Sequence, residues 1–461
     1  MAPVADRRFT LTAPRPHTEA VPELDADQSA VLAHRDPGAL LVVGGPGTGK
    51  TTTLVESVAA RAVDADLTPH LVLTWSRPAA QELRARLVRR LGRTQVAPKV
   101  MTVHGFCHAL VRRFADPGLI GSQVRLLTAP EQEFRVRELL AGHDTSSWPE
   151  DLRAAAVTRG FASEVRAVLA RTRQLGMDPS DVVRAGRSAL RPEWIAVGEF
   201  FDDYLDVLDA EGALDYAELV HRCRLLLLEP EVRETLASEL TSIHVDEFTE
   251  CDPSQVELLA DLGALGIDVV AFADPSTTVF AFRGADLRGV VDFPKRFEAP
   301  GRPTSRIDLR TNHRQGRILA GSCAGVALKL PANGSSTPAD PAAELPRGRV
   351  EARVHESFGS MVEHVAETLR EAHLERGLAW SEMAVMTRSG RGDLPALTRG
   401  LSAAGVPVEV AGDEIALAEE LSVRPLLLGL DAAARLARGE KPEPDAVSRL
   451  LRSPLGGLDS L

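Results

Sequence analysis

The sequence predicts an α/β fold in which a parallel β-sheet is interrupted by a helical insertion. Short apolar runs alternate with helix-like segments, which is typical of a parallel sheet covered by helices on both faces. The runs are ALLVVGG (39–45), HLVLTWS (70–76), KVMTVHG (99–105), TSIHVDE (241–247) and DVVAFAD (268–274). Three runs precede residue 110 and two follow residue 240, so the chain between them must leave the sheet and return to it.

The intervening segment is helical by pattern. It contains EQEFRVRELLAGH, SEVRAVLARTRQLG and GEFFDDYLDVLDAEG, whose apolar residues recur at helical spacing. We therefore expect a first sheet domain made of residues 1–114 and 236–305, with a helical insertion domain at 115–235.

A second α/β unit is expected to begin at residue 306 and to extend to residue 430. In this region MVEHVAETLREAHLERG predicts a helix and EMAVMTRS predicts a strand. Residues 329–349 are rich in Pro, Ala and Ser, which predicts an exposed loop. The pattern of this second unit is incomplete where the chain stops.

The composition is that of an ordinary globular protein, with 44% hydrophobic and 26% charged residues and a net charge of −12. No apolar run approaches the ~20 residues that a membrane-spanning helix needs, and the N-terminus lacks a secretory signal, so we expect a cytoplasmic protein. The four cysteines are scattered without a CxxC pair, which favours small buried side chains over zinc or disulfide sites.

One stretch is strongly basic within this acidic chain. Residues 77–114 carry nine Arg or Lys against one acid. Its helix-like part, AAQELRARLVRRLGR, has an apolar stripe opposite Arg86, Arg89, Arg90 and Arg93. Those arginines either form a solvated face or guide a phosphate chain electrostatically.

The stretch GGPGTGKT fits the pattern G-x-x-x-x-G-K-[ST] between an apolar run and a helix-like segment. Glycines in such a turn let backbone N–H groups surround phosphate oxygens at a helix N-terminus. Lys50 would neutralise the β- and γ-phosphates, and the Thr51 hydroxyl would bind Mg²⁺. The alternative is a chance Gly-rich turn, in a chain with five lysines. The residues expected to bind ATP here are Gly44, Gly45, Pro46, Gly47, Thr48, Gly49, Lys50 and Thr51.

Two adjacent acids, Asp246 and Glu247, follow the apolar stretch TSIHV. Neighbouring carboxylates at the end of a buried strand repel each other, so something should offset their charge. In a P-loop protein Asp246 would hold Mg²⁺, and Glu247 would orient and deprotonate the attacking water. The alternative is an acid pair that caps the following helix, DPSQVELLADL.

Six stretches occur in the order that is characteristic of one family. They are LDADQSAVLAH, LTWSRPAAQELRARL, TVHGFCHALVRRF, GALDYAEL, ADPSTTVFAFRGAD and LRTNHRQGRIL. Through them almost the whole chain resembles the UvrD/Rep-like superfamily 1 DNA helicases, and within these the actinobacterial helicase–nuclease subunits (AdnA/AdnB type). The resemblance implies a RecA-like P-loop NTPase sheet with a helical insertion, followed by an incomplete second RecA-like lobe. Residues 431–461 would then open a truncated second insertion.

The resemblance implies a role for individual residues. Gln28 would contact the adenine base, and Thr277 and His313 stand at positions that contact ATP. Arg283 and Arg314 would reach the γ-phosphate and stabilise transition-state charge. The residues implied to contact single-stranded DNA are Trp75, Arg77, His104, Phe280 and Phe282. Aromatic faces suit this role because any base can stack on them. The alternative is that the aromatic residues belong to the core and that His104 is a buried, hydrogen-bonded histidine.

Three positions depart from the family's pattern. Thr249 stands where the family carries Gln after Asp-Glu-Phe, and Thr277 replaces the Gln of the next motif. A threonine hydroxyl is shorter than a glutamine amide and cannot make the same hydrogen bond. His313 replaces a tyrosine that stacks on adenine. We therefore expect retained Mg-ATP chemistry with altered coupling between ATP and DNA.

The resemblance implies an ATP-dependent DNA helicase or translocase of 3′-to-5′ polarity, acting on single-stranded DNA in repair and recombination. ATP and Mg²⁺ are the expected cofactors, and a second helicase–nuclease subunit is a candidate partner. A non-catalytic subunit that binds ATP and DNA is the alternative, and an unrelated P-loop kinase is a third interpretation. The family's later motifs are not recognisable, so we expect a fragment, a truncated product or a protein that needs a partner.

Overall fold

The computed structural model describes most of the chain. The described residues are 22–62, 70–91, 99–114, 125–281, 284–330, 339–388, 390–410, 423–453 and 455–458. The chain divides into two compact units, Met1–Val350 and Glu351–Leu461. The first contains a sheet, its covering helices and a helical insertion, whereas the regular structure described in the second is helical.

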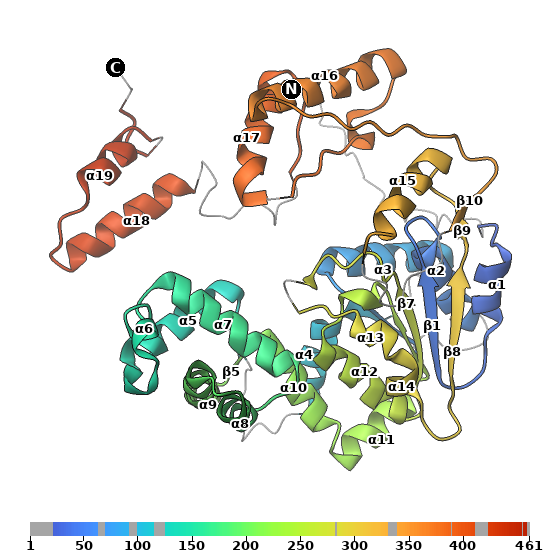
Figure 1. The fold of residues 1–461 in the computed structure, drawn as a ribbon, viewed down its shortest axis with the longest axis horizontal. Coiled ribbons are helices and arrows are strands. Elements are labelled where there is room, and N and C mark those ends of the chain that lie inside the picture. Colours follow the sequence, from blue (N-terminus) through green and yellow to red (C-terminus); the bar gives the residue numbers. More distant parts are fainter. Residues whose placement is uncertain are drawn as a thin grey trace, which may run out of the picture. The chain divides into compact units, whose positions relative to one another are not determined.

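The first unit is built on a six-stranded parallel sheet (Figure 1). In spatial order its strands are β3 (Lys99–Thr102), β2 (His70–Thr74), β6 (Ser242–Val245), β7 (Asp268–Ala273), β1 (Ala39–Gly44) and β8 (Thr304–Leu309). The five apolar runs predicted as strands are thus confirmed. Every residue of β1 and β2 is buried, because helices cover both faces of the sheet.

Alternate residues of β1 belong to two different cores. Leu41 and Val43 lie in one core, and Leu40 and Val42 lie in the other, as the two-residue period of a strand requires. The helices that contribute to the first core include α4 (Val103–Phe114), α12 (Pro253–Ala264), α13 (Arg288–Val291) and α14 (Phe293–Phe297). Those of the second are α1 (Ala26–Ala33), α2 (Lys50–Ala62) and α3 (Arg77–Leu91).

The helical insertion has a core of its own. Its helices are α5 (Ala129–Gly142), α6 (Glu150–Arg153), α7 (Arg159–Gln174), α8 (Pro179–Ala189) and α9 (Pro192–Glu211). The three predicted amphipathic stretches are confirmed within α5, α7 and α9. Glycines allow α8 and α9 to approach closely, since a Cβ at Gly198 would lie 2.7 Å from Val183 and one at Gly186 would lie 2.9 Å from Ile195.

The insertion ends earlier than the expected boundary at residue 235. Helix α10 (Tyr216–Leu226) precedes that boundary, and α11 (Pro230–Glu239) spans it. Leu219 of α10 and Leu236 of α11 are nevertheless buried in the core of the sheet domain. The short strands β4 (Arg125–Leu126) and β5 (Ala213–Leu214) pair in parallel just before α10 begins. A helical pattern shows that a helix has an apolar face, but not which core covers that face.

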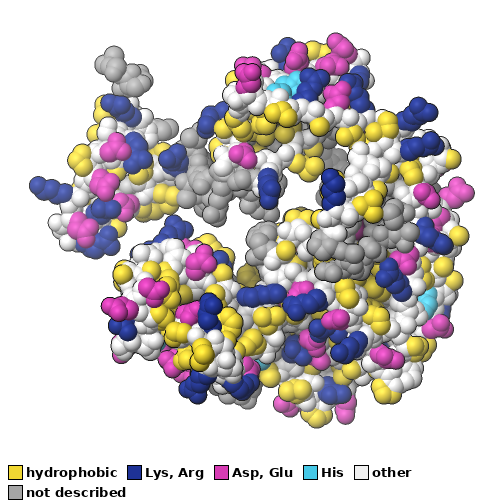
Figure 2. Space-filling model, in the orientation of Figure 1, with side chains coloured by type: hydrophobic (Ala, Val, Ile, Leu, Met, Phe, Trp, Pro, Cys, Tyr) yellow, Lys and Arg dark blue, Asp and Glu magenta, His cyan; other side chains and the backbone are white. Residues whose placement is uncertain are grey.

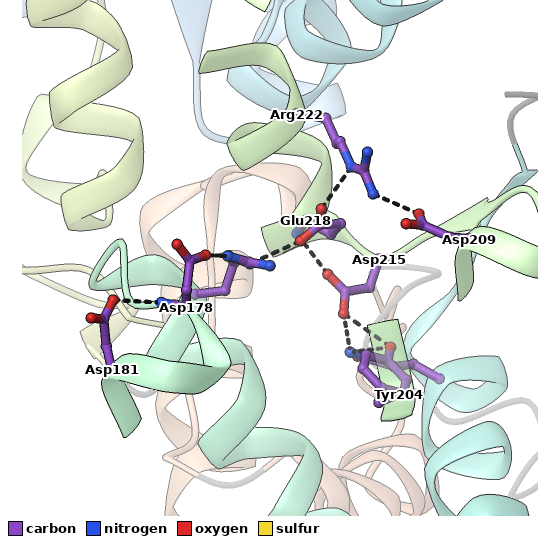
Figure 3. A network of polar contacts seen from close by, with 9 residues as sticks. Asp178, Asp181, Tyr204, Asp209, Asp215, Glu218 and Arg222 are labelled. Carbon is purple, nitrogen blue, oxygen red and sulfur yellow. Dashed lines mark hydrogen bonds and ion pairs between the residues drawn. The ribbon is translucent and has the colours of Figure 1, made fainter. Parts of the chain in front are cut away.

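A buried polar network joins the insertion to α10 (Figure 3). Arg173 of α7 lies 2.8 Å from Glu218 of α10, and their side chains are 5% and 4% exposed. The Glu218 N–H donates to Asp215 at 2.8 Å. The same Asp215 carboxylate accepts hydrogen bonds from Tyr204 of α9 at 3.0 Å and from Gln132 of α5 at 2.7 Å. This buried ion pair and these hydrogen bonds connect α5, α7 and α9 of the insertion to Asp215 and α10.

The expected boundary between residues 305 and 306 falls inside β8. This strand pairs in parallel with β1, so residues 304–309 complete the first sheet instead of opening a second lobe. β8 is an edge strand that carries Arg306 and Asp308 and is only partly buried, which hides it from a search for apolar runs. The elements that follow it in the first unit are β9 (Thr311–Asn312), α15 (Arg317–Ala327) and β10 (Asp340–Pro341).

The second unit differs from its expected α/β pattern. Its helices are α16 (Phe358–Arg376), α17 (Gly390–Ala403), α18 (Arg424–Ala437) and α19 (Pro444–Leu451). The predicted helix is confirmed as α16, whose Val362 shares an apolar core with Leu401 of α17. The predicted strand is wrong: residues 383–387 form no strand, and Met386 is 93% exposed. An apolar stretch becomes a strand only beside another strand, and the described part of this unit supplies none.

The cysteines follow the prediction with one exception. Cys107, Cys223 and Cys251 are buried, but Cys323 is exposed on α15, a helix with no fully buried residue. Within the described ranges, none of the helices combines the length and the apolar character that crossing a membrane requires.

Candidate functional site

The candidate site lies along the carboxyl-terminal edge of the parallel sheet. The residues that leave this edge are the turn 44–51 after β1, Trp75 after β2, Asp246 and Glu247 after β6, and Asp274 after β7. Carboxyl ends of neighbouring parallel strands meet at one edge, so residues far apart in the sequence gather there.

The predicted phosphate-binding turn has the backbone that this role needs. Gly47 and Gly49 have φ values of +86° and +79°, which L side chains rarely adopt. α2 begins at Lys50, and the first N–H groups of a helix have no partner within it. The Lys50 ammonium group donates to the carbonyl oxygen of Gly44 at 2.9 Å and lies 3.7 Å from Asp274 Oδ2. This arrangement suits the oxygens of a phosphate chain.

Gln28 supports this turn. Its side chain is buried; Nε2 donates to the carbonyl oxygen of Thr48 at 3.2 Å, and Oε1 accepts the Asp25 N–H at 3.1 Å. A Cβ at Gly49 would lie only 2.5 Å from Gln28 Nε2, so this close approach requires glycine. The adenine contact of Gln28 stays a prediction. The structure adds that Gln28 links the N-terminus of α1 to the phosphate-binding turn.

The end of β9 and the residues that follow it lie against the same turn. Asn312 Nδ2 donates to the carbonyl oxygen of Pro46 at 3.0 Å, and the His313 N–H donates to that of Gly47 at 2.8 Å. The His313 ring lies 2.9 Å from the carboxylate that caps α1. Arg314 is exposed, and a Cβ at Gly47 would lie 3.1 Å from Arg314 Cβ. His313 and Arg314 therefore lie beside the turn, as their predicted contacts with ATP require.

Asp246 and Glu247 bury negative charge at the end of β6. Burial raises the pKa of Asp246 to about 7; the charge of Glu247 adds to this shift and Lys50 opposes it. Burial also raises the pKa of Glu247, with Lys50 opposing the shift and Asp274 reinforcing it. A nearby cation would reverse these shifts, because it favours the ionised carboxylates.

These acids fit a magnesium ion. Asp246 Oδ1 and Asp274 Oδ2 are buried and accept no hydrogen bond from the residues that the structure describes. A buried carboxylate oxygen without a hydrogen bond is unfavourable, and oxygens are the ligands that Mg²⁺ prefers. Thr51, the second residue of α2, is half-buried at the start of that helix. The predicted pair of ligands, Thr51 and Asp246, is therefore chemically suitable.

Glu247 has a strained backbone. Its φ and ψ are both 50°, in the left-handed region that non-glycine residues avoid. It precedes the 3₁₀ turn η2 (Phe248–Glu250), which directs the chain away from β6. Strain of this kind concentrates at functional sites, where the surrounding structure holds a residue in an unfavourable conformation.

The two threonines that replace family glutamines lie in different environments. Thr249 is fully buried, and its hydroxyl has no hydrogen-bond partner among the residues that the structure describes. Thr277 is exposed, and its N–H donates to the carbonyl oxygen of Asp274 at 3.1 Å. Thr249 therefore leaves an unsatisfied buried hydroxyl, as its poor match to the family pattern suggested.

Two residues expected to contact DNA form an aromatic pair, in which Trp75 is exposed and Phe280 is half-buried. Trp75 is 45% exposed, and its ring centroid lies 4.8 Å from that of Phe280, with the planes inclined by 38°. Arg77 is exposed at the first position of α3. Phe282, also expected to contact DNA, and Arg283, expected to reach the γ-phosphate, lie outside the described residues.

His104 is a packed side chain. It lies edge-on to Tyr216, with centroids 5.0 Å apart, and its Nε2 lies 3.3 Å from Gln255 Nε2. Burial lowers its pKa to about 4, so the ring is neutral at pH 7. It could donate a hydrogen bond to a DNA phosphate, but it would not bring a positive charge.

Two arginines of the predicted stripe on α3 are engaged within the protein, and Arg93 lies outside the described residues. Arg86 forms an ion pair with Glu82 at 2.5 Å, and Arg90 forms one with Glu56 at 2.7 Å. On the face shown in Figure 2, basic and acidic side chains are interspersed and form no single basic field. The contacts of Arg86 and Arg90 favour a structural role over a phosphate-guiding stripe.

Three residues of the site are absent from the predicted set. Asp274 faces Lys50, Asn312 holds the phosphate-binding turn, and Glu250 accepts two backbone hydrogen bonds described below. Asp274 ends a predicted apolar run just as Asp246 does, and this shared signal could have identified it. The other two contacts depend on tertiary structure.

The parallel sheet, the phosphate-binding turn after β1 and the acids after β6 define a RecA-like P-loop nucleotide-binding domain. Comparison with known proteins narrows this class. A family model described as UvrD/REP helicase N-terminal domain matches residues 24–298. The chain belongs to this family, whose members are helicases that bind ATP and DNA.

Individual relatives agree with the family match. ATP-dependent DNA helicase PcrA of Staphylococcus aureus (strain Mu50) is 24% identical over 299 residues, which are 64% of this chain and 38% of that protein. DNA helicase II of Escherichia coli (strain K12) is 25% identical over 289 residues, 62% of this chain and 37% of that protein. The matched region therefore spans less than half the length of either relative.

Proposed function

We propose that this chain hydrolyses ATP and uses the energy to move along single-stranded DNA, as the motor portion of a helicase. One observation carries the proposal. The phosphate-binding turn and the aromatic pair Trp75–Phe280 follow strands of one sheet at the same edge, and Asp246 and Glu247 follow β6, the strand between β2 and β7. A nucleotide and a nucleic acid bound there would share the same strand ends.

The residues at this edge divide the chemical work. Bound ATP supplies the phosphoanhydride bond and Mg²⁺ offsets the charge of its phosphates. Lys50 would hold the β- and γ-phosphates, and Thr51 and Asp246 would hold the metal. Glu247 would take a proton from the attacking water as the general base. Arg314, beside the turn, would stabilise charge on the transferred phosphoryl group, as Arg283 would.

The aromatic pair would supply the grip on DNA. Bases stack on exposed aromatic rings irrespective of sequence, which a motor that moves along DNA requires. Arg77 would contact the sugar–phosphate backbone beside Trp75, and His104 could add an uncharged hydrogen bond. Thr277 and His313 would complete the nucleotide site.

The wider role follows from the family resemblance. It comprises 3′-to-5′ movement, participation in DNA repair and recombination, a cytoplasmic location and a second helicase–nuclease subunit as partner. One observation favours a different function: Thr249 is buried where the family carries a coupling glutamine, and its hydroxyl has no hydrogen-bond partner within the described part of the chain. A subunit that binds ATP and DNA but does not hydrolyse ATP is therefore the second candidate.

Steady-state ATP hydrolysis, measured with and without oligo(dT), tests the proposal. We expect DNA-stimulated turnover that Lys50→Ala abolishes, because no other group replaces the ammonium charge at the phosphates. Lys295→Ala, which removes an exposed lysine on α14, is the matched control and should leave turnover unchanged. A folded chain that binds ATP and DNA without turnover would support the non-catalytic subunit instead.

A further inference from the structure

The Glu250 carboxylate joins the nucleotide site to the backbone that carries Phe280. Its Oε1 accepts the Val279 N–H at 2.8 Å, and its Oε2 accepts the Phe280 N–H at 2.9 Å. One half-buried carboxylate thus holds two consecutive backbone N–H groups. Hydrogen bonds to an ionised carboxylate are roughly twice as strong as those between neutral groups.

The other end of this link is the candidate catalytic base. Glu250 closes η2, the turn that follows Glu247, and its N–H donates to the Glu247 carbonyl oxygen at 2.9 Å. A displacement of the Glu247 backbone would therefore move Glu250, and with it Phe280. The Phe280 ring in turn contacts Trp75. A continuous series of contacts therefore leads from the end of β6 to the aromatic pair formed by Trp75 and Phe280.

The segment held by Glu250 also begins at the nucleotide site. It leaves β7 at Asp274, 3.7 Å from the Lys50 ammonium group, and the Thr277 N–H donates back to the Asp274 carbonyl oxygen. The segment is thus anchored at Asp274 on the nucleotide side and by Glu250 near Phe280. Such a segment can respond to a ligand that changes the surroundings of Lys50.

We propose that Glu250 is a positioning residue that couples nucleotide binding to single-stranded DNA binding. The inference rests on the proposed function, because it requires both ligands to bind this unit. It names the group that links the two sites in a chain where threonine replaces glutamine at positions 249 and 277. Glu250 touches neither ligand; it acts through the backbone of Val279 and Phe280.

The test measures the affinity for fluorescein-labelled oligo(dT) by anisotropy, with and without Mg²⁺ and a non-hydrolysable ATP analogue. For the unmodified chain we expect the nucleotide to change the dissociation constant for DNA by about fivefold or more, as coupled sites typically do. The Glu250→Ala variant should still bind each ligand alone. However, the ratio of its DNA dissociation constants with and without the nucleotide analogue should fall to within about twofold of one. Coupling is reciprocal, so DNA should change the affinity for the analogue by the same factor.

Further variants separate coupling from folding. Glu250→Asp keeps two acceptor oxygens and should restore part of the ratio, whereas Glu250→Gln keeps only one and should not. Glu250→Gln also replaces Glu250→Ala if the alanine variant does not fold. Glu234→Ala, which removes an exposed acid of α11, is the matched control. If Glu250 had a purely structural role, its replacement would weaken the binding of both ligands and lower thermal stability. The ratio of the DNA dissociation constants with and without nucleotide would then stay unchanged.

Each outcome decides one of the two proposals. An unmodified chain that binds neither ligand would overturn the proposed function, and the inference with it. A chain that binds both ligands with a ratio of one would overturn the role of Glu250 alone. So would a Glu250→Ala variant that keeps the full ratio.

Discussion

The indole ring of Trp75 and the phenyl ring of Phe280 lie in contact, with their centroids 4.8 Å apart. Trp75 follows β2 and Phe280 follows β7, while β6 runs between those strands in the sheet. The pair thus spans the strand end that carries Asp246 and Glu247. Trp75 nevertheless leaves 45% of its surface in water. A large aromatic surface kept exposed beside a buried acidic site is typical of a ligand-binding face.

Trp75→Ala should weaken the binding of oligo(dT) by about five- to 150-fold, which corresponds to the ~1–3 kcal/mol of one stacked base. The measurement is fluorescence anisotropy at fixed salt. Trp194→Ala is the matched control, because Trp194 lies on α9 with a similar 44% exposure. Equal losses for both variants would mean that Trp75 has no special role in DNA binding.

Gly49→Ala should destabilise the chain and weaken its binding of ATP analogues. The left-handed φ alone costs about 1–2 kcal/mol for a side chain, and the new Cβ would displace the Gln28 amide, 2.5 Å away. Chemical denaturation and analogue titration measure the two effects. Gly45→Ala is the control for stability, since its Cβ would meet nothing within 4 Å. Equal stability of the two variants would show that Gln28 does not restrict this turn.

Arg173→Met should lower the free energy of unfolding by about 3–5 kcal/mol, because it removes one partner from the buried Glu218 carboxylate. Burial already raises the pKa of Glu218, and Arg173 opposes that rise. Without Arg173 the folded-state pKa rises further, so the loss should grow as pH increases above the unfolded value. Denaturant unfolding at pH 5 and pH 8 measures this.

The exposed Arg184 of α8 is the control for this prediction. Its side chain is 71% exposed, and its contact with Asp181 is a surface ion pair. Arg184→Met should therefore change stability by no more than about 1 kcal/mol at either pH. A comparable loss for both arginines would mean that the buried network does not hold the insertion in place.

His104→Gln should make the protein less sensitive to acid. The folded-state pKa of His104 is about 4, below its usual value of 6.5, so the unfolded chain binds the proton first as pH falls. The unmodified chain should then lose about 3 kcal/mol of stability from this group between pH 6.5 and pH 4. As pH falls from 6.5 to 4, the unfolding midpoint of the unmodified chain should therefore approach that of the His104→Gln variant. Parallel pH profiles would contradict the shift.

Glu247→Gly and Glu247→Gln should both abolish ATP turnover, since neither can accept a proton from water. They should differ in stability, because only glycine adopts the left-handed conformation of residue 247 without strain. We expect Glu247→Gly to be more stable than Glu247→Gln by about 1 kcal/mol in chemical denaturation. Nucleotide affinity, measured alongside, should stay close to that of the unmodified chain in both variants. If the glycine variant were no more stable, strain at this residue would be negligible.

Local patterns were sufficient for the elements that carry the site. The phosphate-binding turn from Gly44 to Thr51 and the acid pair at Asp246 were recognisable because their chemistry depends on residues close together in the chain. The apolar runs identified five strands because a strand buried on both faces must be apolar throughout. β8 escaped this search, since an edge strand tolerates polar residues such as Arg306.

The sequence by itself identified candidate residues for binding phosphate and metal, because spacing and side-chain chemistry are local properties. The candidates for binding DNA bases came from its resemblance to the helicase family. Only the tertiary structure decided which of them meet. It assigned α10 and α11 to the sheet domain, brought Asp274 to Lys50 and attached Glu250 to the backbone at Phe280. These contacts join segments many residues apart, and they form where burial of apolar surface brings those segments together. No periodicity within a single segment encodes that choice.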